Sequence, residues 1–317
     1  MNYSKQYITE FSLKTGFIAS NIEKVIRLLD VLGFIFNESS FRDALSLKGG
    51  TAINLIHSGL KRLSVDIDLD YHRSLDKDET AKDRTLILQE LDGYMEKEGY
   101  SISNKSRGST ILTSRTYSYL NAFGNNDNIK VEINFIDRIS LYPTVINNVV
   151  YFDKNIRIIS LVKEELYGMK LAALIDRSKP RDLYDADYLF NNLEGMDLVD
   201  LRKAVVFYLS LDGVFKIDET TFKGINAISG SAIKKELLPV LKKGEGFDLS
   251  KTKESVVKNL SGLLSLERNE SLYLEEFSKG NYDSNLLFEK PIAERAEKHP
   301  MAKWRISKIK NKQVLQA

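Results

Sequence analysis

The spacing of apolar residues over the first half of the chain changes from helical to strictly alternating. Between Ser20 and Phe36 apolar residues recur every three or four positions, which predicts a helix of about four turns with one buried face. Ser20, with Glu23 three residues later, has the form of a capping box at its start. The segment "ALSLKGG" (44–50) then predicts a short strand ending in glycines, and "TAINLIHSG" (51–59) a short helix.

Two later segments, residues 63–71 and 129–137, alternate apolar and polar residues and therefore predict amphipathic β-strands. Their apolar faces would join the core, and their polar faces would look away from it. The apolar faces hold Val65, Ile67, Leu69 and Tyr71 in the first strand, and Val131, Ile133 and Phe135 in the second. The polar faces hold Ser64, Asp66, Asp68 and Asp70, and Lys130, Glu132 and Asn134.

The pattern becomes helical after about residue 155 and stays so. A helix is predicted up to Arg177, with Ser160 able to cap it, and "SKP" separates it from the next helix. The predicted fold class is α+β. Residues 1–155 form a mixed β-sheet with helices, and residues 156–317 form a helical bundle.

The composition narrows the chemistry. The 317 residues contain no cysteine, which excludes disulfides, thiolate nucleophiles and cysteine-ligated zinc. The three histidines are scattered, so a bound metal is expected to have oxygen ligands and to be Mg²⁺ or Mn²⁺. The N-terminus lacks the apolar run of a signal peptide, and no apolar stretch has membrane-spanning length. We therefore expect a cytoplasmic protein that does not associate with a membrane.

Acidic residues stand where a strand is expected, although aspartate is among the poorest strand formers. Asp66 and Asp68 lie two apart and so share one face. Two ionised carboxylates this close repel each other unless a cation lies between them, and Mg²⁺ commonly takes one or two carboxylates plus phosphate oxygens. Glu132 becomes a third acid if its strand pairs beside theirs with Glu132 inward. The same pattern also fits solvated acids on a half-exposed sheet.

The turn "GGT" (49–51) supplies a candidate phosphate site. Glycines let the backbone approach a phosphate closely, and the Thr51 hydroxyl and helix N-terminal amides can bind phosphate oxygens. By itself, a glycine pair after a strand indicates only a turn. The order of strand, Gly-Gly-hydroxyl turn, short helix and Asp-x-Asp strand resembles the nucleotidyltransferase superfamily with the DNA polymerase β-like fold.

Four separated motifs resemble, in the same order, the AbiEii/AbiGii toxin family of nucleotidyltransferases. The first is GG[ST] followed by R-x-S-x-D-[IF]-D-[LF], at residues 49–51 and 62–69. The second is the strand that carries Glu132. The third is K-x-E-L-x-x-x-K followed by R-D-x-x-D, at residues 163–185, and the fourth is "HPMAKWRI" (299–306).

This resemblance implies a nucleotidyltransferase that uses an NTP with Mg²⁺ or Mn²⁺, with residues 1–155 as its nucleotidyltransferase domain and residues 156–317 as a helical domain completing the active site. It also implies the toxin of a type IV toxin–antitoxin, or abortive infection, system of phage defence. The acceptor would be RNA, with the acceptor end of tRNA favoured, and the antitoxin a separate protein. Two alternatives stay open: a non-catalytic nucleotide- or RNA-binding module of the same fold, and transfer onto a protein hydroxyl.

The candidate site residues follow from these motifs. Those for catalysis are Asp66, Asp68, Glu132, Lys170 and Asp182. Those for nucleotide binding are Gly49, Gly50, Thr51, Arg62, Ser64, Lys163 and Lys170. Those for the metal ion are Asp66, Asp68 and Glu132. Asp70, one step beyond the Asp-x-Asp pair, is expected to face solvent at the strand end.

Basic residues at two places need separate interpretation. Lys163, Lys170 and Arg177 recur every seventh residue and so share one helix face, where they either meet a triphosphate or, at the two ends, are simply solvated. Asp182 follows Pro180 at a helix start, where a capping role would also explain it. From Lys298 onward the chain has six basic residues and no acid, which fits either contact with RNA phosphates or a solubilising end.

Overall fold

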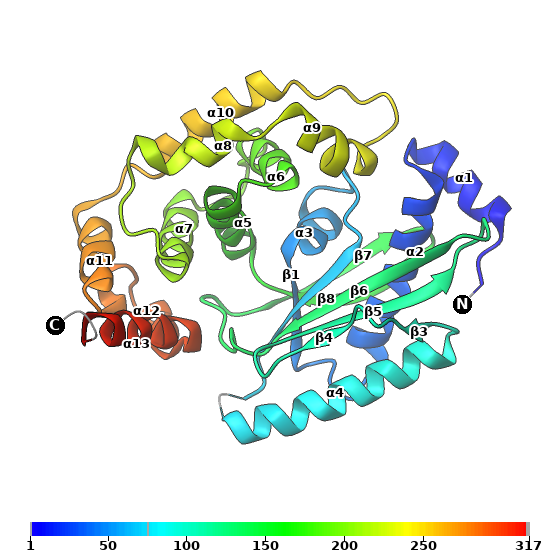
Figure 1. Cartoon of the computed structure of the whole chain (residues 1–317), viewed down its shortest axis with the longest axis horizontal. Helices are drawn as coiled ribbons and strands as arrows, with labels where there is room; N and C mark the ends of the chain where they lie inside the picture. Colours follow the sequence, from blue (N-terminus) through cyan, green and yellow to red (C-terminus); the bar gives the residue numbers. More distant parts are fainter. Residues whose placement is uncertain (1, 75, 315–317) are drawn as a thin grey trace. The chain divides into compact units, whose positions relative to one another are not determined.

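The computed structural model describes residues 2–74 and 76–314. Its backbone contacts divide the chain into two compact units. The first comprises Met1–Arg138, Thr144–Leu161 and Leu238–Glu245, and the second comprises Ile139–Pro143, Val162–Leu237 and Gly246–Ala317. The predicted α+β class is confirmed, with a mixed sheet in the first unit and helices in the second (Figure 1).

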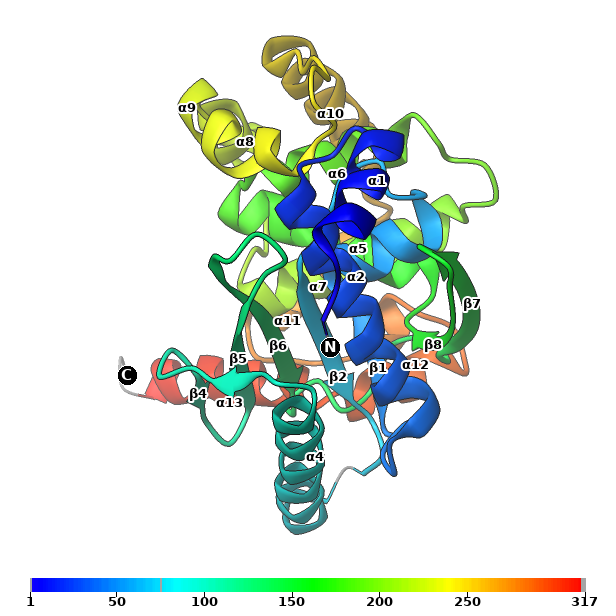
Figure 2. The ribbon, with the colours of Figure 1, turned by 90° about the vertical axis from the view of Figure 1, so that its right-hand side faces the viewer.

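The first unit is built on one sheet with strand order β3-β5-β6-β2-β1-β8-β7, in which β4 also pairs with β5. The β2–β6 and β1–β8 pairs are parallel and the others are antiparallel. Figure 2 shows β7 at one edge. The strands are β1 Leu45–Lys48, β2 Asp66–Tyr71, β3 Ser101–Ile102, β4 Arg107–Gly108, β5 Leu112–Leu120, β6 Asn126–Asn134, β7 Val145–Tyr151 and β8 Lys154–Ser160.

Helices of the first unit cover the apolar face of the sheet, as the alternating pattern predicts. The Tyr71 hydroxyl of β2 donates a 2.8 Å hydrogen bond to Asp83 of α4, and Arg27 of α2 lies 4.2 Å from the ring centroid of Tyr119 in β5. Figure 1 shows α4 running alongside β3. The helices are α1 Lys5–Thr15, α2 Ala19–Gly33, α3 Gly49–Ala52 and α4 Lys77–Lys97, and π-helical turns at Phe34–Glu38 and Ile53–His57 extend α2 and α3.

A segment distant in sequence completes the first unit. The Leu63 N–H donates to the Val240 carbonyl, and the Lys243 N–H donates to the Gly16 carbonyl, each at 2.8 Å. The first bond holds the loop that leads into β2, and the second ties the same segment to the turn after α1.

The second unit is helical and has a tight central contact. A Cβ added at Gly168 of α5 would lie only 2.6 Å from the Cβ of Ala204 in α7, so glycine is what allows these helices to approach so closely. The α-helices are α5 Lys163–Arg177, α6 Pro180–Phe190, α7 Leu198–Asp212, α8 Lys223–Ala227, α9 Gly230–Ala232, α10 Leu249–Leu263, α11 Arg268–Ser278, α12 Ile292–Lys298 and α13 Pro300–Val314. None of the helices in the described ranges is long and apolar enough to cross a membrane.

Both caps expected from the sequence are wrong. Helix α2 has Ile18 at its N-cap position and no side-chain cap, and Glu23 is instead buried in a 2.8 Å ion pair with Arg27. Helix α5 has Val162 at its N-cap, because Ser160 still belongs to β8. In both places the chain turns into the helix at a residue that lacks a capping side chain.

Candidate functional site

Pairing of the sheet brings the predicted acids to adjacent positions. Strands β2 and β6 are parallel neighbours, and Asp68 is directly opposite Glu132. On its other side, β2 pairs with β1 so that Asp68 is opposite Lys48. The two amphipathic strands therefore pair side by side, which is the condition under which Glu132 would be a third acid. Asp66 and Asp68 are half-buried on the face opposite the apolar core.

The glycine turn makes room for the acidic strand. Gly49 has a left-handed φ of +69°, and a Cβ there would lie 2.4 Å from the Asp68 Oδ2 atom. A Cβ at Gly50 would lie 2.8 Å from Arg62 Nη2 and 3.1 Å from Ser64 Oγ. The two glycines thus allow three motif side chains to lie against the turn, which explains why the glycines and these residues occur together.

The Thr51 hydroxyl connects the turn to the same strand. It is buried and donates a hydrogen bond to the backbone carbonyl of Asp66. The hydroxyl proton is therefore used in a hydrogen bond that holds α3 against β2. A direct hydrogen bond from this hydroxyl to phosphate stays a prediction. Arg62 is likewise buried and donates to the Leu63 carbonyl at 3.1 Å.

Two lysines that sequence reasoning missed lie among the acids. Lys130 Nζ is 2.7 Å from the Glu132 carboxylate. Burial lowers the pKa of Lys130, but the hydrogen bond to Glu132 and the negative charges of Glu132, Asp66 and Asp68 raise it above its ordinary value. A signal was available, because Lys130 stands two residues before Glu132 on the same strand face.

Lys48 is the second, and it corrects the expectation for Asp70. Its Nζ is 2.6 Å from Asp70 and 3.8 Å from Asp137, and Asp70 is only 5% exposed. Burial lowers the pKa of Lys48, but the charges of Asp70 and Asp137 raise it well above its ordinary value. Asp70 does not face solvent; it is the buried partner of a lysine. Leaving it out of the predicted ligand set agrees with this pairing.

Two of the predicted acids have the arrangement that a divalent metal ion needs. Across residues 2–74 and 76–314, no group of three or more His, Cys, Asp or Glu side chains is placed to hold one. Glu132 is paired with Lys130. Asp66 and Asp68, on one half-buried face beside the glycine turn, match the pair of carboxylates that Mg²⁺ uses when phosphate oxygens complete its shell. These two residues therefore fit the ion, and Glu132 as a third ligand stays a prediction.

In the second unit, the predicted residues Lys170 and Asp182 belong to a network of ion pairs. Lys170 Nζ lies 2.9 Å from Asp182 and 3.1 Å from Asp185, and Arg177 Nε lies 2.8 Å from Asp182. Burial raises the pKa of Asp182, but Lys170 and Arg177 outweigh it, so the pKa is lowered overall. Asp182 is not the N-cap of α6, a position held by Lys179. Capping alone therefore does not explain it.

Lys163 does not join this group, although it shares the seven-residue spacing. Its Nζ donates to the Glu194 carbonyl at 2.9 Å. Arg181, from the same family motif, donates to the Glu236 carbonyl at 2.9 Å. The seven-residue spacing of Lys170 and Arg177 puts both on one face of α5. Both side chains form ion pairs with Asp182.

The mixed sheet with a glycine turn against an Asp-x-Asp strand is the arrangement of a nucleotidyltransferase. The model of the family described as "Nucleotidyl transferase AbiEii toxin, Type IV TA system" matches residues 32–256. The chain therefore belongs to the AbiEii family of nucleotidyltransferase toxins of type IV toxin–antitoxin systems.

Comparisons with individual proteins agree on the fold. The structure is similar to MenT4, a nucleotidyltransferase toxin from Mycobacterium tuberculosis H37Rv, with a TM-score of 0.66 and 14% sequence identity. The match covers 97% of this chain and 99% of that one. At this identity the likeness establishes the shared fold. A comparison with curated protein sequences gave no match.

Proposed function

We propose that the protein transfers a nucleotidyl group from an NTP to RNA, with the acceptor end of tRNA as the favoured acceptor, and releases pyrophosphate. The hydroxyl oxygen of the acceptor forms a bond to the α-phosphorus as the bond to the β-phosphate oxygen breaks. The hydroxyl proton leaves to a base, and pyrophosphate carries away the electron pair. A divalent cation supplies charge neutralisation for both oxygens when bound.

The observation that carries this proposal is the contact of the Asp68 carboxylate with the Gly49 turn. Phosphates that approach the first-turn amides of α3 would meet the acids directly beside them, and those amides have no partner inside the helix. Asp66 and Asp68 would hold Mg²⁺ or Mn²⁺. Ser64, beside Gly50, is suited to orient a phosphate oxygen.

Glu132 and Lys130 would each contact the substrates or a second cation on this face. Glu132 would bind a second cation or accept the proton of the attacking hydroxyl. Either role requires Glu132 to leave Lys130, which is then free to pair with the triphosphate. Lys130 thus neutralises part of the negative charge of the acidic face without nucleotide.

We extend the proposal to Lys163, Lys170 and Asp182 on the strength of the family motif. Lys170 would neutralise charge that develops during transfer, and Asp182 would hold its ammonium in place. Because Lys170 is buried between two carboxylates, its orientation is fixed before any nucleotide binds. A substitution of Asp182 would therefore remove a negative charge and also release the Lys170 ammonium from its fixed orientation.

The biological part of the proposal is a toxin whose modification of tRNA stops translation in the cytoplasm, as in abortive infection during phage defence. The antitoxin would be a separately encoded protein. Inhibition of the toxin by direct binding is one of two possibilities, and control of its synthesis is the other.

The test is incubation with each of four α-³²P-labelled NTPs, Mg²⁺ and total tRNA, followed by separation of RNA and protein. We expect label on RNA from the wild type, none from Asp66→Asn, and wild-type labelling from Asp78→Asn, an exposed acid on α4. Equal labelling by wild type and Asp66→Asn would refute the proposal. Label on protein alone would support transfer onto a protein hydroxyl, and NTP binding without Mg²⁺ dependence or label would support a non-catalytic module.

A further inference from the structure

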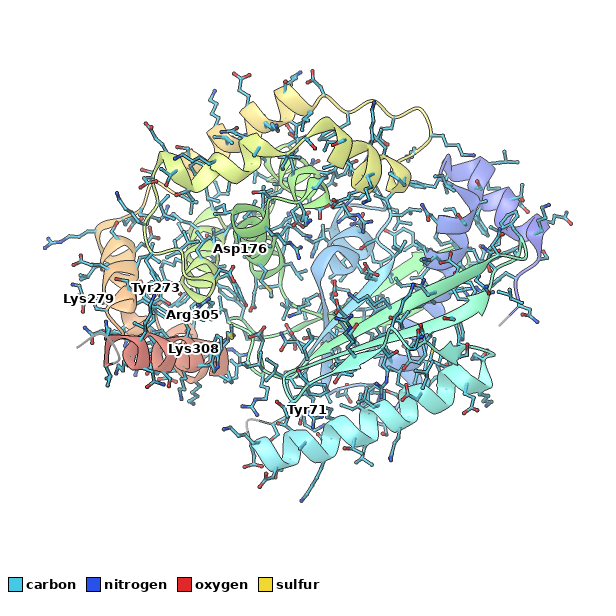
Figure 3. The ribbon with its side chains drawn as sticks, in the orientation of Figure 1. Tyr71, Asp176, Tyr273, Lys279, Arg305 and Lys308 are labelled. Atoms are coloured by element: carbon cyan, nitrogen blue, oxygen red, sulfur yellow. The ribbon has the colours of Figure 1, made fainter. Side chains whose placement is uncertain are left out.

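The basic C-terminal stretch forms a helix, α13, that is anchored to its unit along one side. Arg305 Nε donates to the Leu211 carbonyl at 2.5 Å, and Gln313 Nε2 donates to the Lys279 carbonyl at 3.2 Å. Ala302 is buried, and a Cβ at Gly280 would lie 3.0 Å from Lys310 Cγ. Figure 3 shows Arg305 and Lys308 on this helix, with Lys279 at the nearby end of α11. These contacts hold one side of α13 against its own unit, so the opposite side is the one that faces outward.

The outer surface of α13 combines cations with an aromatic ring. Trp304 is 39% exposed, and Lys308 Nζ lies 4.5 Å from its ring centroid. At 3.6 residues per turn, Trp304 lies between a row with Lys303 and Lys310 and a row with Lys308 and Lys312. All four lysines are exposed. We call these five residues the α13 surface.

No acid neutralises the α13 surface within the described chain. From Lys298 to the end of α13 the sequence contains no Asp or Glu, and none of the four lysines forms an ion pair among residues 2–74 and 76–314. The nearby acids Glu275 and Glu276 of α11 are both bound by Lys279, at 2.6 and 2.8 Å. Four like charges kept together without counter-charges indicate a partner that supplies negative charge.

The chemistry of the surface favours nucleic acid over a membrane. A helix that lies on a lipid surface turns its apolar side outward, into the lipid. In α13 the small apolar residue Ala302 is buried, and the large apolar side chains exposed on the outward side, among the four lysines, are Trp304 and Val314 at the last helical position. Lysines about 6 and 10 Å apart along the helix axis, around a ring able to stack on a base, suit a phosphate backbone with an unpaired base.

We propose that the α13 surface binds RNA, with its lysines on the phosphates and Trp304 stacked on an unpaired base. That this RNA is the acceptor of the transfer reaction rests on the proposed function. The binding itself does not, because it uses none of the residues at the glycine turn or the acidic strands.

Trp304 is the only tryptophan of the chain, so its fluorescence reports on this surface directly. The experiment uses full-length protein with the Asp66→Asn substitution, which is expected to prevent turnover. Total tRNA should quench the fluorescence of Trp304 in a saturable manner, and added salt should reverse the quenching. Trp304→Phe keeps a ring, and Trp304→Ala removes it. Measured with end-labelled tRNA, Trp304→Ala should weaken binding about 5- to 150-fold and Trp304→Phe by less.

The lysines are tested by the salt dependence of tRNA binding. Replacing all four with Gln should reduce the slope of log K against log [salt] by about 3, since each phosphate contact contributes about 0.7 to 0.9. The matched control replaces four exposed lysines of the first unit, Lys77, Lys82, Lys97 and Lys105, with Gln. It changes the net charge equally but removes three lysines that stand among the acids of α4, and Lys105 between β3 and β4, so its slope should stay near that of wild type.

The outcomes separate this inference from the proposed function. The inference is overturned if both quadruple variants lose the same slope, or if the α13 variant binds tRNA like wild type while its circular dichroism shows a folded protein. Transfer to RNA by wild type in that case leaves the proposed function intact. Salt-dependent quenching of Trp304 by tRNA without any labelling of RNA supports the α13 surface and contradicts the proposed acceptor.

Discussion

The sharpest structural prediction concerns Gly49, where backbone conformation and crowding act together. Gly49→Ala places a Cβ 2.4 Å from Asp68 Oδ2 and 3.1 Å from Asp68 Cγ, whereas ordinary contacts begin near 3.4 Å. The side chain of Asp68 must then shift by about 1 Å, and a displacement of this size in a catalytic group costs about 100-fold in rate. The φ of +69° adds about 1–2 kcal/mol of strain for any residue with a Cβ.

Gly59 supplies the matched control in the same segment. Its φ is +61°, and no described heavy atom lies within 4 Å of a Cβ placed there, so Gly59→Ala carries the backbone strain without the crowding. We expect urea unfolding to show a loss of about 1–2 kcal/mol for Gly59→Ala. Gly49→Ala should lose a further 1–3 kcal/mol or so from overpacking.

The assay that decides is labelling of RNA by the two variants at a temperature where both are folded. Gly59→Ala should retain near wild-type labelling, and Gly49→Ala should lose about 100-fold. Equal losses in the two variants, in stability and in labelling alike, would show that the contact between Gly49 and Asp68 has no particular role, and the reasoning would fail.

Three further predictions concern the charges around the acids. Lys130→Met removes the cation that competes for Glu132, so Mn²⁺ should bind at least about fivefold tighter by titration calorimetry; unchanged or weaker binding would contradict this. Lys48→Met removes the ammonium that lies 2.6 Å from the buried Asp70 carboxylate and should lower the free energy of unfolding in urea by about 3–5 kcal/mol, whereas a loss below 1 kcal/mol would contradict a stabilising role of this ion pair. The lowered pKa of Asp182 means that its stabilisation is present above pH 3.8 and is lost as the pH falls below that value. The gap in unfolding free energy between wild type and Asp182→Asn should therefore close in acid, and a gap independent of pH would refute the assignment.

The alternating strands show what sequence could predict. Strict alternation fixes which side chains share a face, and an apolar face fixes the register because a one-residue slip would expose it. Alternation does not determine which strands are neighbours, so the pairing of the Asp68 and Glu132 strands was only a condition at the level of sequence, and the structure meets it. The glycine pair was also placed correctly, but its close contact with Asp68 depends on side-chain positions that spacing does not encode.

One interpretation that failed depends on a partner distant in sequence, and another on a local pairing. Lys48 and Asp70 are 22 positions apart and pair because β1 and β2 are antiparallel, a fact that neither residue's neighbours reveal. Ser20 had the form of a cap, but the N-cap position is held by Ile18, two residues earlier, and Glu23 pairs with Arg27 instead. Lysine side chains are usually exposed to solvent, so the sequence alone gives little reason to expect a lysine to be buried beside acids.

The central claim is that the Asp-x-Asp strand and the glycine turn form one site for a nucleotide and its metal ion. The most direct measurement is the anomalous difference map of wild-type crystals grown with Mn²⁺ and a non-hydrolysable NTP analogue. We expect a manganese peak about 2.1 Å from carboxylate oxygens of Asp66 and Asp68, with phosphate density against the backbone at Gly49 and Gly50. A triphosphate bound away from this turn, or a metal ion that contacts neither aspartate, would contradict it.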